Sequence, residues 1–266
     1  MGQFPSHAVR GRHRIADLDP ASSTIGITAA QPEVVLARAV DQPATFLRRQ
    51  LAGQTVGSYR LRNGMTVSLR HRTGDMAMFT RVFYRRLYEQ PESVRRRLRP
   101  PLRVVDLGAN IGLFSAQLGR DATVTAVEAD DLNADVLERM IAANGLAWPV
   151  VRGYASNSAG TINFIGGKAC LSKADPSGDP INKVDVFPLF AGADLLKMDI
   201  EGGEWEILAD PRMADEGPPV VVMEWHSMRC PEPDARKAAS EALATAGYTG
   251  FEVGPPGPNG HLWAWR

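Results

Sequence analysis

From residue 102 onward, short apolar segments of strand length alternate with segments of helical periodicity. The strand-like segments are 102–108, 123–129, 149–156, 193–202 and 218–226. The helical segments are 111–120, 131–145, 203–210 and 234–248. Such repeated units predict a Rossmann-like α/β fold, in which helices cover both faces of a mostly parallel sheet. Residues 249–266 predict two further short strands, which give this sheet one antiparallel terminal strand.

The part before residue 102 follows a different pattern. Residues 58–72 alternate around Asn63-Gly64, which predicts a hairpin, and residues 74–89 show helical spacing. Glu33 to Gly53 predicts a helix that is kinked near Pro43. We therefore expect three regions, namely an irregular and helical extension (1–57), a hairpin and helix cap (58–101) and the α/β domain (102–266).

Composition narrows the class of protein but names no partner. The 266 residues are 44% hydrophobic, and their formal net charge is zero. No apolar run reaches the roughly 18 to 20 residues that cross a bilayer, and the first 20 residues lack the apolar core of a secretory signal. The two cysteines, Cys170 and Cys230, have no metal-binding spacing and are expected to be free thiols. These features predict a cytoplasmic protein without a membrane span.

Eight arginines lie between Arg81 and Arg103. They could form a solvated face or an anion-binding patch beside the active site. Aromatic residues are not interleaved among them as in single-strand-binding proteins, so no nucleic-acid partner is expected. Apolar residues of the extension, such as Val34 and Leu47, could cap the active site or pair with a second copy of the chain.

The segment VVDLGANIGLFS, residues 104–115, places a glycine-framed turn between a strand and a helix. Glycines permit close backbone approach, and the start of a helix offers unpaired N–H groups to a carboxylate. The dinucleotide fingerprint needs a middle glycine where this turn has Asn110, and no Lys follows as in a P-loop. Glu128 follows Gly108 by about 20 residues, the spacing at which an acidic side chain accepts ribose hydroxyls. Together these residues predict S-adenosylmethionine rather than NAD.

Three motifs together resemble the FkbM-type methyltransferases. They are the turn at 104–115, the segment DLLKMDIEGGEWEIL at 194–208 and the strand VVVMEWH at 220–226. The resemblance covers residues 58–266. It implies a class I methyltransferase fold, S-adenosylmethionine as the methyl donor, and a hydroxyl of a sugar, glycolipid or polyketide-type product as the acceptor. The cofactor-binding residues expected from the turn and the resemblance are Asp106, Gly108, Ala109, Asn110, Gly112, Glu128, Ala129, Tyr154, Ala155, Ser156 and Asp199.

The expected catalytic residues lie at the carboxyl ends of two strands, where open α/β sheets bind their ligands. Asp199 and Glu201 end one strand, and Glu224 and His226 end the next. His226 is the leading general base because an ordinary histidine pKa suits proton removal near neutral pH, although it could simply bond a neighbouring loop. Asp199 could orient that base, bind the acceptor or cap the cofactor turn, and Glu201 joins them through its motif.

Three further expectations concern the surroundings of this site. Lys197 shares a strand face with Asp199, so it could form a buried ion pair there. Asp199, Glu224 and His226 could bind Mg²⁺ or Mn²⁺, but we favour a site without metal. A third strand, 149–156, is followed by a short strand at 161–166 and by a loop-like stretch that could act as a lid.

These features predict an S-adenosylmethionine-dependent O-methyltransferase that acts on a small-molecule hydroxyl, on a sugar or a secondary metabolite. Two alternatives stay open at this point. One is an N-methyltransferase for an amine or peptide, and the other is a non-catalytic binding module that retains the sheet. An NAD-dependent oxidoreductase is a remote further alternative.

Overall fold

The computed structural model describes residues 39–53, 56–167 and 172–266. Most of the predicted extension, including the start of the expected Glu33–Gly53 helix, lies outside these residues, as does Cys170. Within them, helix α2 (Pro43–Ala52) begins at the residue where a kink was expected, and its proline occupies the first turn.

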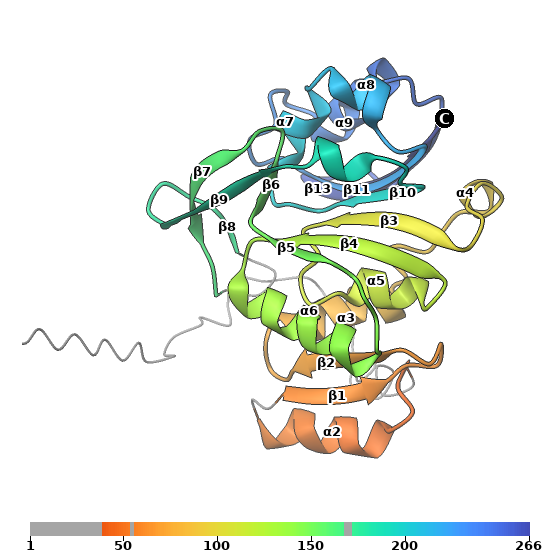
Figure 1. Ribbon diagram of the computed structural model, residues 1–266, viewed down its shortest axis with the longest axis vertical. Helices are drawn as coiled ribbons and strands as arrows, with labels where there is room; N and C mark the ends of the chain where they lie inside the picture. Colours follow the sequence, from red (N-terminus) through yellow and green to blue (C-terminus); the bar gives the residue numbers. More distant parts are fainter. Residues whose placement is uncertain (1–38, 54–55, 168–171) are drawn as a thin grey trace, which may run out of the picture. The chain divides into compact units, whose positions relative to one another are not determined.

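A seven-stranded sheet forms the centre of the described part (Figure 1). Its order is β12 (Gly250–Val253), β13 (Asn259–Trp265), β11 (Val220–His226), β10 (Leu195–Met198), β3 (Leu102–Leu107), β4 (Ala122–Glu128) and β5 (Val150–Arg152). Strands β11, β10, β3, β4 and β5 pair in parallel, whereas β13 runs antiparallel to both of its neighbours. The predicted mostly parallel sheet with a reversed terminal strand is confirmed.

Helices cover both faces of this sheet (Figure 1). On one face lie α5 (Leu113–Leu118) and α6 (Asp131–Ala143), and on the other lie η4 (Phe187–Phe190), α7 (Glu204–Leu208), α8 (Arg212–Glu216) and α9 (Ala235–Thr245). Successive strand residues alternate between two apolar clusters, so that Val104 belongs to one and Val105 to the other. Both faces are therefore buried, which explains the continuous apolar runs of the sequence.

A second, four-stranded sheet was not expected. Its order is β6 (Tyr154–Ser156), β9 (Asp179–Asp185), β7 (Gly160–Ile165) and β8 (Lys173–Ala174). The prediction of one continuous strand over 149–156 is wrong, because the chain leaves the central sheet at Gly153. There a Cβ atom would lie 2.7 Å from the Val184 side chain and 2.9 Å from the Asn182 carbonyl oxygen.

The loop-like stretch after residue 166 is also corrected. The segment DPINKVD pairs as β9 between β6 and β7, and the short β8 pairs with β7. This segment is largely polar, has a proline as its second residue and contains no fully buried residue. It therefore carries no apolar signal, and its strand conformation depends on pairing with β6 and β7.

The hairpin at Asn63-Gly64 is confirmed by antiparallel pairing of β1 (Val56–Arg60) with β2 (Thr66–Arg70). Helix α3 (Gly74–Phe79) then continues as a π-helix, η2 (Thr80–Tyr84), so the expected helix ends five residues early. The short α4 (Glu92–Arg95) precedes the central sheet.

The hairpin and the helix after it share one apolar core with the sheet domain. Val67, Leu69 and Phe79 belong to the same buried cluster as Leu137 and Met140 of α6. Polar contacts add to this, since the Asn144 side chain bonds both the N–H (2.8 Å) and the carbonyl (2.7 Å) of Thr66. The cap is therefore held firmly against the α6 side of the sheet.

None of the helices within the described ranges combines the length and apolarity that a bilayer crossing requires.

Candidate cofactor and acceptor site

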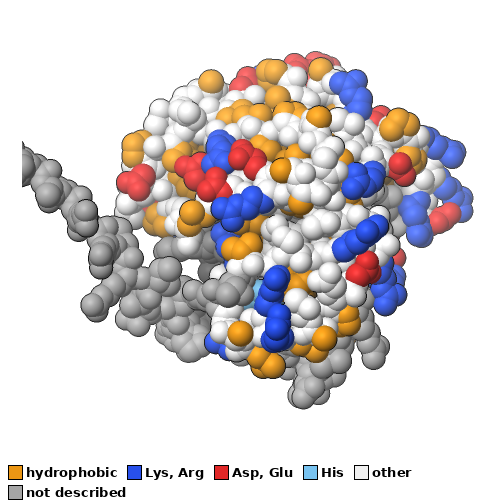
Figure 2. Space-filling view, turned by 60° about the horizontal axis from the view of Figure 1, so that its bottom comes forward, with side chains coloured by type: hydrophobic (Ala, Val, Ile, Leu, Met, Phe, Trp, Pro, Cys, Tyr) orange, Lys and Arg blue, Asp and Glu red, His pale blue; other side chains and the backbone are white. Residues whose placement is uncertain are grey.

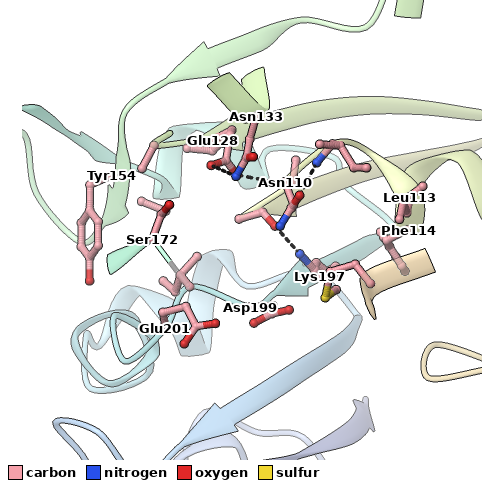
Figure 3. Close-up of a pocket in the computed structure, with 18 of the residues that line it drawn as sticks. Asn110, Leu113, Phe114, Glu128, Asn133, Tyr154, Ser172, Lys197, Asp199 and Glu201 are labelled. Carbon is pink, nitrogen blue, oxygen red and sulfur yellow. Dashed lines mark hydrogen bonds between the residues drawn. The ribbon is translucent and has the colours of Figure 1, made fainter. Parts of the chain in front are cut away.

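A pocket opens beyond the carboxyl ends of β3, β4 and β10 (Figure 3). Parallel α/β sheets bind ligands at this edge. Among the residues predicted for the site, the pocket is lined by Gly108, Ala109, Asn110, Glu128, Ala129, Tyr154, Ala155, Asp199 and Glu201. Four predicted residues, Asp106, Gly112, Ser156 and His226, are buried or half-buried nearby but do not line it.

The glycines of the turn are required by packing within the protein. Gly108 has φ +72, and a Cβ atom there would lie 1.9 Å from the carbonyl oxygen of Asp199. Gly112 has φ +82, and a Cβ would meet the Leu137 and Met140 side chains at 2.6 and 2.5 Å. Contacts with Asp199, just after β10, and with α6 therefore require these glycines in addition to the ligand approach that the sequence predicts.

Glu128 holds the turn from the pocket side. One carboxylate oxygen accepts the N–H of Asn110 at 2.7 Å, and the other accepts the N–H of Asp130 at 2.9 Å. Burial raises the pKa of Glu128 to about 7, against the opposing effect of these backbone bonds. The oxygen that accepts Asp130 also accepts the side-chain N–H of Asn133 at 3.4 Å. A carboxylate has about four acceptor positions, so one remains for a ligand hydroxyl, on the oxygen that accepts Asn110.

Asp106 acts on the turn indirectly. It is fully buried, accepts the Ser115 hydroxyl at 2.6 Å and lies 3.1 Å from the Lys197 ammonium. Lys197 in turn donates to the Gly108 carbonyl at 2.6 Å and reaches the pocket wall. The buried lysine–aspartate pair considered for Lys197 therefore exists, but its partner is Asp106 and not Asp199.

At the other end of the pocket, three predicted catalytic residues come together. The His226 Nε2 atom lies 3.8 Å from an Asp199 oxygen and 3.6 Å from a Glu201 oxygen. The Tyr88 hydroxyl donates to the second Asp199 oxygen at 3.0 Å, and the His226 Nδ1 atom contacts the carboxylate of Glu204. Figure 3 shows Asp199 and Glu201 across the cavity from Glu128 and Asn110.

The pKa of His226 differs from the ordinary histidine value that the sequence predicts. Burial alone would lower the pKa of His226, but the bond to Glu204 and the charges of Glu204, Asp199 and Glu201 outweigh it and raise the pKa to about 9. In the ligand-free protein His226 is therefore protonated at neutral pH. Burial raises the pKa of Glu201 to about 7, and its side chain is 35% exposed toward the pocket.

The possible metal ligands considered from the sequence were Asp199, Glu224 and His226, but the structure brings a different group of three together. Asp199, Glu201 and His226 each offer one ligand atom, and these atoms lie within 4.8 Å of one another. Glu224 instead forms an ion pair with Arg81. A divalent ion could reach the first three groups, where it would replace the proton of His226.

The sequence did not predict Arg81 and Tyr88 as residues of the site. Both come from the N-terminal cap, and both line the pocket. Their helical spacing predicted packing, and no local signal placed them against strand ends more than 100 residues away. Arg81 does belong to the arginine-rich stretch, but its charge faces Glu224, and Arg95 and Arg96 pair with Glu92 on the surface. On the face shown in Figure 2, basic and acidic side chains are interspersed.

Trp205 and Trp225, from the two motifs beside the site, are packing residues. The Trp205 indole donates to the backbone carbonyls of His226 and Met228, at 3.1 and 3.2 Å. Trp225 is fully buried, and Gly260 on the neighbouring strand lies directly over its ring. The expected free thiol is present at Cys230.

No known family profile matches this chain, and no curated protein matches its sequence. Similar solved structures do exist. Precorrin-6y C5,15-methyltransferase from Geobacter metallireducens is 16% identical over 68% of this chain and 92% of its own, with a TM-score of 0.40. A SAM dependent methyltransferase from Aquifex aeolicus is 15% identical over 70% of this chain and 91% of its own, also with a TM-score of 0.40.

A tRNA (uracil-54, C5)-methyltransferase from Pyrococcus abyssi, solved in complex with S-adenosyl-L-homocysteine, is 12% identical. The match covers 80% of this chain but 44% of that protein, with a TM-score of 0.43. At such identities the likeness concerns the fold alone. The sheet order and the reversed strand β13 are those of a class I, Rossmann-like methyltransferase fold.

Proposed function

We propose that this chain is an S-adenosylmethionine-dependent O-methyltransferase of the FkbM type, which acts on a hydroxyl of a sugar or secondary metabolite. The observation that carries the proposal is a single pocket with two chemically different ends. One end combines the Gly108–Asn110 turn with Glu128, and the other combines Asp199 and Glu201, with the buried His226 directly behind them. A methyl transfer needs a donor site and a proton-accepting site in one cavity.

The residues at the first end fit the donor. Glu128 has one acceptor position left for a ribose hydroxyl, and Ala129, Tyr154 and Ala155 form the adjoining wall where the adenine would lie. When bound, S-adenosylmethionine supplies a methyl group that is activated by the positive charge of sulfur. Asp199 and Glu201 favour a positive charge nearby, because their carboxylates face the same cavity.

The residues at the second end fit an acceptor hydroxyl. His226 accepts the hydroxyl proton, Asp199 is held in place by Tyr88 and orients the acceptor, and Glu201 stabilises the protonated imidazole. In the ligand-free protein His226 already carries a proton. A cation in the pocket lowers the pKa of the imidazolium by charge repulsion, so the base becomes available when the donor is present.

Titration calorimetry with S-adenosylmethionine and S-adenosylhomocysteine tests the donor site. We expect both to bind to the unmodified protein, and Glu241→Gln, which changes an exposed residue of α9, to bind them equally well. If the unmodified protein binds neither, the proposal fails.

One observation favours an amine acceptor as the second candidate. Asp199 and Glu201 place two carboxylates at the acceptor end of the pocket, which would attract a cationic amine. Incubation with hydroxyl and amine acceptors and methyl-labelled donor, followed by NMR of the product, separates the two. A methyl carbon bonded to nitrogen would replace the O-methyltransferase proposal.

We further propose that the reaction proceeds without a resident metal. The protonated His226 already supplies a positive charge to Asp199 and Glu201, and Glu224 is neutralised by Arg81. Activity should therefore be unchanged after EDTA treatment and dialysis. A loss that added Mg²⁺ or Mn²⁺ restores would contradict this.

A further inference from the structure

Glu204 is the most deeply buried carboxylate at the acceptor end. Its exposed fraction is 0%, and one of its oxygens contacts Nδ1 of His226. A buried charge is costly unless it is paired. Its position in the first turn of α7 does not explain this burial, because Glu206 in the same turn is exposed. The contact with His226 does explain it.

The neighbouring residue fixes the backbone of the same histidine. The Trp205 indole donates to the carbonyl of His226 at 3.1 Å and to that of Met228 at 3.2 Å. Two consecutive residues of α7 therefore hold His226, Glu204 by the ring and Trp205 by the main chain. Turning the ring would break its contact with Glu204, and shifting the backbone at the end of β11 would break the bonds from Trp205.

With Nδ1 engaged by Glu204, Nε2 is the ring nitrogen that remains for other partners. It faces Asp199 and Glu201 at 3.8 and 3.6 Å, distances longer than a hydrogen bond. An acceptor hydroxyl placed between these groups could contact Nε2 and a carboxylate together. The ring orientation thus decides which nitrogen meets the acceptor.

We propose that Glu204 is a positioning residue of the methyl-transfer site, which fixes the ring and tautomer of His226 so that Nε2 faces the acceptor between Asp199 and Glu201. This inference rests on the proposed function, since it gives His226 a role toward the acceptor. Glu204 links the two motifs of the sequence that had separate explanations, the LLKMDIEGGE segment and the VVVMEWH strand. A simpler alternative is that Glu204 only neutralises a buried charge.

The test compares Glu204→Gln with Glu216→Gln, which removes an equal charge from an exposed position at the end of α8. Long-range ¹⁵N–¹H spectra of histidine-labelled protein report which ring nitrogens carry protons. In the unmodified protein and in Glu216→Gln, we expect a persistent proton on Nδ1 of His226 when the pH is raised. In Glu204→Gln, we expect a mixture of tautomers.

Kinetics supply a second readout. A base oriented by a carboxylate loses about 10²- to 10⁴-fold in rate when that carboxylate is neutralised, so kcat/KM of Glu204→Gln should fall within this range. The rising limb of its pH profile should also move to lower pH, because Glu204 no longer favours the protonated ring. Binding of S-adenosylhomocysteine should change by less than about threefold, since Glu204 does not line the pocket.

The outcomes are distinguishable. If Glu204→Gln folds but leaves the ¹⁵N pattern and the pH profile unchanged, Glu204 has only a packing role and the inference is wrong. If that variant does not fold, the spectrum of the unmodified protein still decides, because a neutral ring protonated on Nε2 would overturn the inference. Failure of the unmodified protein to bind the donor would overturn the proposed function, while the tautomer measurement would still report on Glu204.

Discussion

The two ends of the pocket are built in different ways. At the donor end, the turn, Glu128 and Asp130 lie within 23 residues of one another and are joined mainly through backbone N–H groups. At the acceptor end, side chains from the cap meet strand ends far along the chain, as Arg81 meets Glu224 and Tyr88 meets Asp199. The first end is specified by local geometry, and the second by an ion pair and a hydrogen bond across the fold. A local motif can therefore predict most of the first end, while the partners that the cap supplies to the second end require the structure.

The largest expected effect separates the ends by activity. His226→Gln removes the proposed base, so kcat should fall by about 10²- to 10⁴-fold, as for other positioned bases. Affinity for S-adenosylhomocysteine, whose sulfur is uncharged, should stay within about threefold in calorimetry, because His226 does not line the pocket. An equal loss of donor affinity and of kcat would mean that the two ends are not separate.

Glu128→Ala should produce the opposite pattern. It removes the carboxylate that supports the Asn110 and Asp130 backbone and that we assign to the ribose, so donor affinity should fall by about 10²-fold. Calorimetry with S-adenosylhomocysteine measures this, with Glu241→Gln as the control. An unchanged dissociation constant would remove Glu128 from the donor site.

Gly108→Ala tests how far the turn depends on protein packing. The new Cβ would lie 1.9 Å from the Asp199 carbonyl, so the free energy of unfolding should fall by about 2 to 4 kcal/mol. Gly145→Ala is the matched control, because Gly145 also has a positive φ of +63 but nothing within 4 Å of a Cβ. It should cost about 1 kcal/mol. Urea denaturation of both variants isolates the contact, and equal losses would show that backbone conformation alone requires Gly108.

The smallest expected effect concerns pH. Only unprotonated His226 can accept a proton, and its pKa in the free protein is raised to about 9 by Glu204 and neighbouring charges that outweigh burial. The pH profile of kcat/KM for the methyl donor reports the free protein. This ratio should therefore rise about tenfold per pH unit up to about pH 9. The profile of kcat reports the donor-bound complex and should level off at lower pH, because the donor carries a positive charge. A kcat/KM profile that is flat from pH 7 to 9 would argue against His226 as the base.

The sequence predicts those parts of the molecule that depend on short segments of the chain. The sheet, the hairpin at Asn63-Gly64 and the Glu128 position follow from apolar runs, turn residues and spacing within short segments. The second sheet did not, because β9 is polar and is held by its partners. The raised pKa of His226 could not be predicted either, since it depends on Glu204 and on the burial of both side chains. Local patterns specify elements, whereas charges brought together by folding require the tertiary structure.

A crystal structure with S-adenosylhomocysteine would show whether the turn and Glu128 bind the nucleoside of the methyl donor. We expect a ribose hydroxyl within hydrogen-bond distance of the Glu128 carboxylate, and the sulfur directed toward Asp199 and His226. A ligand bound elsewhere, with Glu128 bonded to the Asn110 and Asp130 backbone alone, would contradict it.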